Sequence, residues 1–160
     1  MWYNQLMSEK WYVSLNENLR PWALESLQLL HLAQHSGETF VNYDFVVYPL
    51  AKAYEGFLKD FLWKLKLIDE RTYNSKKFSI GRALNPDVRL EQRDEGWLFD
   101  DLVRECGEHV ALEIWDAWLM RNRLIHLYPG EIQTTTLPEA ESKIKQLVRV
   151  IELCSVCPRV

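Results

Sequence analysis

The sequence predicts an all-α protein, a bundle of four to five helices, and three observations support this prediction. Apolar residues recur at intervals of three and four along most of the chain, which is the period of one face of a helix. Glycine and proline mostly fall between these runs, where they bound helices. The sequence also contains no glycine-rich phosphate loop and no internal repeat. Packed helices are therefore the expected architecture.

The length and composition indicate one globular domain. At 160 residues the chain can bury roughly two thirds of its unfolded surface, and 48% hydrophobic with 26% charged residues is typical of a folded protein. We expect residues 1–160 to form a single domain, with residues 1–20 as a possible N-terminal extension. Residues 1–11 lack the apolar core of a secretory signal, and no apolar run has membrane-spanning length. A cytoplasmic location is therefore expected.

Two helices are predicted in the first half of the chain. The first begins at Pro21 and ends before Gly37. The second extends from Tyr43 to Ile68, and Pro49 either kinks it or marks its start. Its broad apolar stripe consists of Val47, Leu50, Tyr54, Phe57, Leu58, Phe61, Leu62 and Leu65.

The helical pattern weakens between residues 69 and 96, where one short helix is predicted over residues 78–84. The basic residues of this connection are Lys76, Lys77, Arg82, Arg89 and Arg93. Charged loops are usually solvated, so we favour that interpretation over a surface that faces RNA.

The C-terminal half contains three further predicted helices. Residues 97–105 form the first, Gly107 interrupts the pattern, and residues 109–127 form the second. Residues 134–136 are expected to be briefly extended before Pro138 opens the last helix. The apolar side of that helix consists of Ile144, Leu147, Val148, Ile151 and Leu153.

The cysteines and paired histidines do not form a recognisable metal site. Cys106, Cys154 and Cys157 are an odd number, which argues against a disulfide framework. The last two have the spacing of a zinc or redox pair, but no second pair accompanies them, so we expect small buried side chains on the last helix. His31 and His35 lack a third ligand and are interpreted as surface or packing residues. No metal is predicted.

The spacing of an arginine, four residues and a histidine occurs twice. Arg104 to His109 crosses the predicted helix break and includes two carboxylates, which would repel a phosphate and neutralise the arginine. Arg121 to His126 lies near the end of an apolar helix, has no carboxylate between its ends and includes a second cation, Arg123. Of the two segments, only the one from Arg121 to His126 is therefore kept as a candidate site.

Helical geometry suggests how this second segment is arranged. Asn122 and His126 lie four residues apart on one face, so the amide can orient the imidazole. Arg121 and His126 are about 140° apart on an ideal helix, so one chain supplies an incomplete site and two copies around a symmetry axis would complete it. Tyr128 precedes Pro129, which disfavours helical geometry there. The competing interpretation is structural: a histidine and an Arg/Asn pair can simply cap a helix end.

Residues 121–128 resemble the signature of the HEPN superfamily, the small all-helical domains of prokaryotic toxins and defence systems. That pattern is Arg, often followed by Asn, Asp or His, then His after four to six residues, and one toxin branch adds Tyr two residues later. The matching residues are Arg121, Asn122, His126 and Tyr128. More weakly, residues 51–59 and 78–81 are similar to the HEPN part of RNase LS-type phage-defence toxins. The resemblance covers residues 43–156.

The resemblance implies a metal-independent endoribonuclease that acts as a homodimer without a cofactor. Arg121 would bind the phosphate, His126 would act as general acid or base, and Asn122 would orient it. Arg123 and Tyr128 would contact RNA, and in the Tyr-bearing branch the tyrosine is also where a nucleotidyltransferase antitoxin attaches nucleotides. Attack by the 2′-hydroxyl of the RNA would yield a 2′,3′-cyclic phosphate and a 5′-hydroxyl.

A second hypothesis is a catalytically silent HEPN-type dimer that binds a protein such as an antitoxin. The net charge of −4 excludes broad, nonspecific coating of nucleic acid and slightly favours this alternative. Trp115 and Trp118 are expected in the core or at the dimer interface rather than as platforms for bases.

Overall fold

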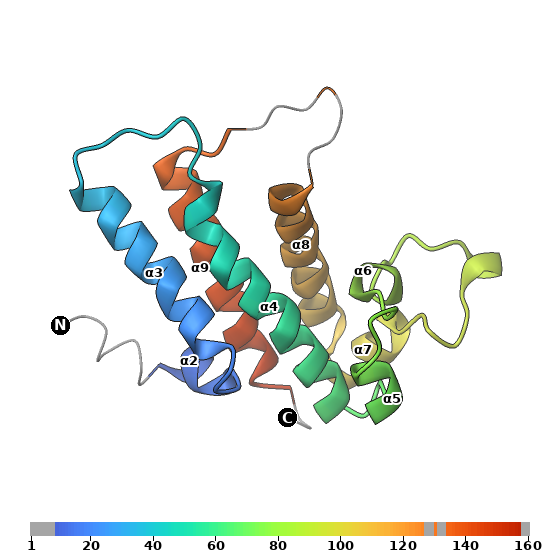
Figure 1. Cartoon of the computed structure of the whole chain (residues 1–160). Coiled ribbons are helices and arrows are strands. Elements are labelled where there is room, and N and C mark those ends of the chain that lie inside the picture. The colour runs from blue at the N-terminus through green and yellow to red at the C-terminus, as the bar shows by residue number, and fades with distance from the viewer. Residues whose placement is uncertain (1–8, 127–129, 131–133, 158–160) are drawn as a thin grey trace.

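The computed structural model describes residues 9–126, 130 and 134–157, and this part of the chain is helical with no strand. The predicted all-α class is therefore confirmed (Figure 1). The helices in chain order are α2 (Lys10–Ser14), α3 (Arg20–His35), α4 (Asp44–Lys64), α5 (Glu70–Tyr73), α6 (Ile80–Ala83), the 3₁₀ helix η1 (Leu90–Gln92), α7 (Phe99–Cys106), α8 (Glu108–Ile125) and α9 (Leu137–Cys154).

Four long helices form the body of the protein, with α4 at its centre. Helix α4 packs against α3, α8 and α9, and α8 also packs against α9 and α7. The predicted apolar stripe of α4 is buried, including Tyr54 and Phe61. The short helix α2 packs on α9 and buries Trp11 and Leu15 almost completely. Residues 10–15, for which the sequence predicted no element, thus contribute to the core.

Pro49 lies inside α4 rather than at its start. Proline has no N–H and its ring crowds the preceding turn of a helix, so carbonyl groups there lose helical partners. In that preceding turn the Val46 carbonyl accepts a hydrogen bond from the buried hydroxyl of Ser26 on α3. The carbonyl that loses its helical donor to Pro49 is that of Phe45, four residues earlier. The Ser26 bond therefore links α3 to the adjacent carbonyl of α4 and does not replace the lost one.

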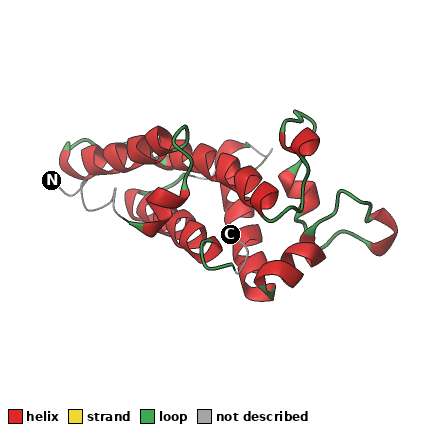
Figure 2. Cartoon of the chain, turned by 90° about the horizontal axis from the view of Figure 1, so that it is seen from below, coloured by secondary structure: helices red, strands yellow, loops and turns green. Residues whose placement is uncertain are grey.

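A segment of short helices projects from one side of the body. Helix α4 ends where Lys66 adopts a left-handed conformation with φ of 60°, and α5, α6 and η1 follow to the side of the long helices (Figure 2). The short helix predicted over residues 78–84 is present as α6. The Leu98 N–H donates to the Ala83 carbonyl at 2.7 Å, which joins the end of this segment to α6.

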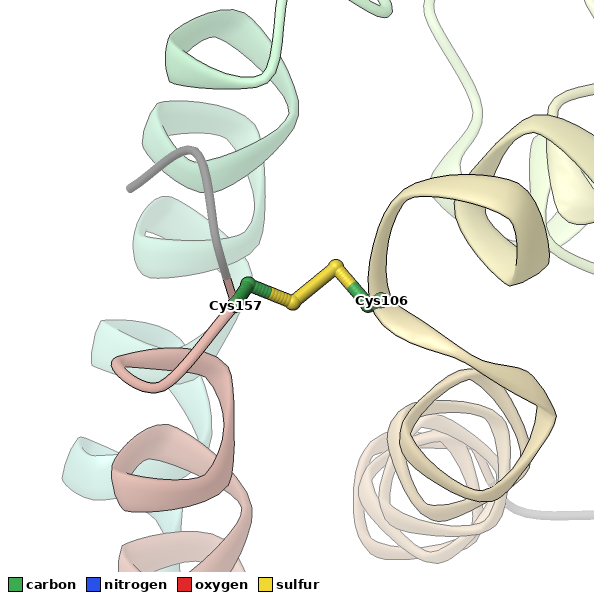
Figure 3. Close-up of a disulfide and its surroundings, with 2 residues drawn as sticks. All are labelled: Cys106 and Cys157. Carbon is green, nitrogen blue, oxygen red and sulfur yellow. A yellow bond between two sulfur atoms is a disulfide. The ribbon is translucent and has the colours of Figure 1, made fainter.

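Cys106 and Cys157 form a disulfide, so the prediction that all three cysteines are unpaired was wrong (Figure 3). The two residues are 51 positions apart in sequence, and packing brings their Cα atoms to 5.1 Å. Only Cys154 follows the expectation, as a free and buried thiol whose pKa is raised by burial. Because disulfides are rare in reducing compartments, the bond weighs against the expected cytoplasmic location. No helix within the described ranges is long and apolar enough to span a membrane.

The residues before α9 are anchored to the start of α4. The Tyr43 N–H donates to the Thr135 carbonyl at 2.9 Å, and the Thr135 hydroxyl bonds to Asp44 at 2.5 Å. Lys143 on α9 donates to the same hydroxyl at 2.6 Å. Thr136 is extended, as predicted, and caps α9 together with Glu139. The chain therefore re-enters the bundle at a fixed point.

Candidate functional site

Arg121 is buried because it continues the core-facing stripe of α8. The buried residues of this helix are Ala111, Ile114, Ala117, Trp118 and Arg121, which recur at three and four. A charged side chain at such a position requires partners, since burying an isolated ion costs many kcal/mol. Arg121 is nevertheless only 8% exposed.

Three groups surround the Arg121 guanidinium. Its Nη2 donates to the Glu55 carboxylate on α4, and Nη1 donates to Asn122 Oδ1 at 3.0 Å. The guanidinium carbon also lies 4.8 Å from the centre of the Trp118 ring, which is within the range of a cation–π interaction. The cation is therefore held by a charge, an amide and an aromatic face.

Glu55 was not among the sequence-predicted site residues. The absence of carboxylates between Arg121 and His126 suggested an unneutralised cation, but the neutralising carboxylate comes from α4. One signal in the sequence points to it: Glu55 lies four residues after Ala51 and three before Leu58, both fully buried. An acidic residue on that line of α4 faces the bundle and needs a partner there.

Two buried donors at this site have no hydrogen-bond partner within the described part of the chain: Arg121 Nε and Trp118 Nε1. Gly81 of α6 lies directly against the indole nitrogen, and a Cβ placed there would be 2.7 Å from it. The close approach of α6 to Trp118 therefore depends on glycine. The unpartnered Nε means that Arg121 uses only part of its donor set.

His126 is the first residue after α8, which ends two residues earlier than predicted. Its backbone is extended, with φ of −107° and ψ of 127°, and its N–H donates to the Asn122 carbonyl at 3.0 Å. The angle of about 140° expected on an ideal helix therefore does not describe the His126 side chain, which is exposed. The side-chain oxygen of Asn122 accepts from Arg121, and its proposed role in orienting the imidazole stays a prediction.

The remaining predicted site residues are only partly placed. Arg123 is exposed on the last turn of α8. Tyr128, proposed as an RNA contact and modification site, lies outside the described residues. The structure thus brings Arg121 and Asn122 together and sets His126 at the end of the same helix.

The rejected segment, Arg104 to His109, has a different environment. Arg104 is exposed and pairs with Asp101 on its own helix at 2.8 Å. Gly107, with φ of 87°, separates α7 from α8, so the predicted helix break is confirmed. His109 is exposed on the first turn of α8.

The other candidates have structural roles. Trp118 is buried and Trp115 partly buried against the core, as expected. The rings of His31 and His35 lie 4.2 Å apart. Among the residues that the structure describes, no group of three metal-ligating side chains is found.

Two arginines of the basic connection pair with neighbouring acids. Arg82 pairs with Asp94 at 2.5 Å, and Arg93 stacks at 3.9 Å from the Trp97 ring centre and lies 3.8 Å from Asp100. These contacts favour the solvated-loop interpretation over an RNA-facing patch.

No protein-family model matches this chain, and neither does any curated protein or solved structure with which it was compared.

Proposed function

We propose that this protein is a metal-independent endoribonuclease that acts as a homodimer in a toxin–antitoxin or phage-defence system, as the HEPN-like pattern implies. The observation that supports this most is the placement of Arg121 and His126. A guanidinium fixed by the core lies within the last two turns of α8, and an exposed imidazole follows directly at the helix end. In this proposal, a phosphate group bound at this end of α8 is contacted by the Arg121 cation and by the His126 imidazole, which can exchange a proton with it.

The proposed reaction is transesterification within the RNA. The 2′-oxygen bonds to phosphorus while the bond to the 5′-oxygen breaks, which yields a 2′,3′-cyclic phosphate and a 5′-hydroxyl. One His126 accepts the 2′ proton and a second donates a proton to the leaving oxygen, since an imidazole can serve as either a general base or a general acid. Arg121 offsets the negative charge that grows on the phosphate.

The homodimer is part of this proposal because one chain supplies a single Arg121 and a single His126. Two copies related by a two-fold axis would present both histidines to one cleft. Arg123 and Tyr128 would contact the RNA. An antitoxin would act at the entrance of the same cleft, either by modifying Tyr128 or by blocking the cleft directly. Sedimentation at micromolar concentration tests the dimer, and a purely monomeric species would contradict the composite site.

Two observations favour a catalytically silent HEPN-type dimer as an alternative function. Glu55 already neutralises Arg121, and aromatic side chains are exposed elsewhere on α4, where Phe45 is 40% and Tyr48 is 42% exposed. Exposed aromatic residues are enriched at protein interfaces. A protein that binds a partner through α4 would use this surface without cleaving RNA.

The substitution His126→Ala separates the two functions, and His109→Ala provides a matched control. Both histidines are exposed and each follows an arginine by five positions. Loss of a general acid or base should slow cleavage of a generic RNA by about 10²- to 10⁴-fold in the first variant and leave the second at the wild-type rate. Cleavage products are followed by gel electrophoresis with end-group analysis. RNA that is cleaved at the same rate by the wild type and by His126→Ala, or that both leave intact, would contradict the proposed nuclease site.

A further inference from the structure

The ion pair between Arg121 and Glu55 is unequal in burial. The side chain of Arg121 is 9% exposed, whereas that of Glu55 is 30% exposed. The cation is fixed in the bundle between Trp118 and Asn122. The anion lies on the solvent side of the pair.

The carboxylate satisfies only part of the guanidinium. Its hydrogen bond is made with Nη2, and Arg121 Nε remains buried with no partner among the described residues. In arginine, Nε and one terminal nitrogen form a planar fork that matches two oxygens of a carboxylate or phosphate. A tetrahedral phosphate with two free oxygens can bond to both nitrogens, which the present carboxylate does not do.

We infer that Glu55 is a built-in stand-in for phosphate: its carboxylate occupies the anion position of Arg121, and a phosphodiester of the bound RNA displaces it. This inference rests on the proposed function for the identity of the displacing ligand. Glu55 is then a positioning residue that keeps the buried guanidinium in place while the site is free of RNA.

The physical reason for such a stand-in is the cost of an unpaired buried charge. Without Glu55, the guanidinium in the core would lose its counterion and destabilise the free protein. With Glu55, every RNA phosphate that reaches Arg121 competes with a carboxylate already bound there. The free protein gains stability at the expense of affinity for RNA.

The test measures RNA binding without cleavage. A fluorescein-labelled 2′-O-methyl oligoribonucleotide has no 2′-hydroxyl nucleophile, so its dissociation constant can be followed by fluorescence anisotropy at fixed ionic strength. Glu55→Gln removes the competing charge and keeps an oxygen acceptor, so binding should tighten about tenfold.

Glu113→Gln is the matched control for this measurement. Glu113 pairs with Arg149 across α8 and α9 at 2.6 Å, so its substitution also removes one negative charge and one interhelical ion pair. Affinity in this variant should change by less than about twofold, because Glu113 lies eight residues before Arg121 on α8, about 12 Å along the helix, where salt screens its charge. Equal tightening in both variants, or unchanged or weaker binding in Glu55→Gln, overturns the inference.

A measurement on the wild-type protein decides the matter even if Glu55→Gln does not fold. On titration with the same oligonucleotide, the ¹H–¹⁵N signal of Arg121 Nε should move downfield as the buried N–H gains an acceptor. An Nε signal that stays unchanged while the oligonucleotide binds overturns the inference, as does a lack of saturable binding.

These outcomes are separable from the nuclease proposal. RNA cleavage that depends on His126, together with unchanged oligonucleotide affinity in Glu55→Gln, removes the stand-in and leaves the nuclease. Tighter binding in Glu55→Gln with no cleavage by any variant supports the stand-in and removes the nuclease.

Discussion

The segments Arg104–His109 and Arg121–His126 share one spacing and differ in almost everything else. Arg104 lies on the exposed side of α7 and pairs with a residue three positions earlier on its own helix. Arg121 lies on the core side of α8 and pairs with Glu55, 66 positions away. The difference follows from register, because only Arg121 falls on the line of Ile114 and Trp118. Identical spacing thus yields a local surface pair in one case and a link between helices in the other.

The largest expected difference between the two segments concerns stability. Arg121→Ala should lower the free energy of unfolding by about 2 to 5 kcal/mol, because it removes a large buried side chain and opens a cavity beside Trp118. Arg104→Ala should cost at most about 0.5 kcal/mol, as is usual for exposed pairs. Urea titration followed by circular dichroism measures both. Similar losses of unfolding free energy in the two variants would show that Arg121 is no more important for stability than Arg104.

The next effect concerns Cys106, which belongs to the exposed segment. Cys157→Ser removes the disulfide and should lower the free energy of unfolding by about 2 to 4 kcal/mol, because the unfolded chain regains the freedom of a long closed loop. Denaturation of the wild type with and without a reductant measures the same quantity. Under non-reducing conditions, unfolded protein should show a single reactive thiol, that of Cys154. Three reactive thiols would contradict the bond.

Gly107 separates the two segments, and its substitution is expected to have an intermediate effect. With φ of 87° and ψ of 154°, it occupies a region of backbone conformation that is essentially restricted to glycine. Gly107→Ala should cost about 2 kcal/mol, although no described atom lies within 4 Å of the added Cβ. Gly96→Ala is the control, since this residue has no positive φ. Equal melting temperatures would show that the break between α7 and α8 does not require glycine.

The smallest effect concerns the neighbours of the two arginines. Asn122→Ala removes the acceptor of Arg121 Nη1 and should cost about 1.5 kcal/mol, a typical value for a hydrogen bond to a charged group. Asp101→Ala removes the partner of Arg104 and should cost less than about 0.5 kcal/mol. Chemical denaturation resolves the difference, and a reversed order would mean that Asn122 does not support Arg121.

Most of the long helices could be predicted because their apolar residues recur with the helical period. The predicted helices over residues 21–36 and 138 onward agree with α3 and α9 to within one residue at their starts. The end of α8 was placed two residues too late, since apolar character continues to Leu127 while the backbone becomes extended at His126. Helix α2 was missed because five residues are too few to show a period.

The environment of the candidate site was less accessible to sequence reasoning. Neither the Arg121–Glu55 pair nor the Cys106–Cys157 bond has a local signature, because each joins residues more than fifty positions apart. Both depend on which helices pack together, and periodicity along one helix carries no information on that choice. The burial of Arg121 could have been predicted from the sequence, because Arg121 continues the apolar stripe of α8.

The disulfide also makes residues 106–157 a closed covalent ring. Both Arg121 and His126 belong to this ring, together with α8, α9 and the connection between them. A protease that cuts one peptide bond between residues 126 and 134 would therefore yield a nicked molecule of unchanged mass apart from one added water. The two polypeptides would separate only after reduction, so cleavage of that connection would leave α9 covalently attached to the fragment that carries Arg121 and His126.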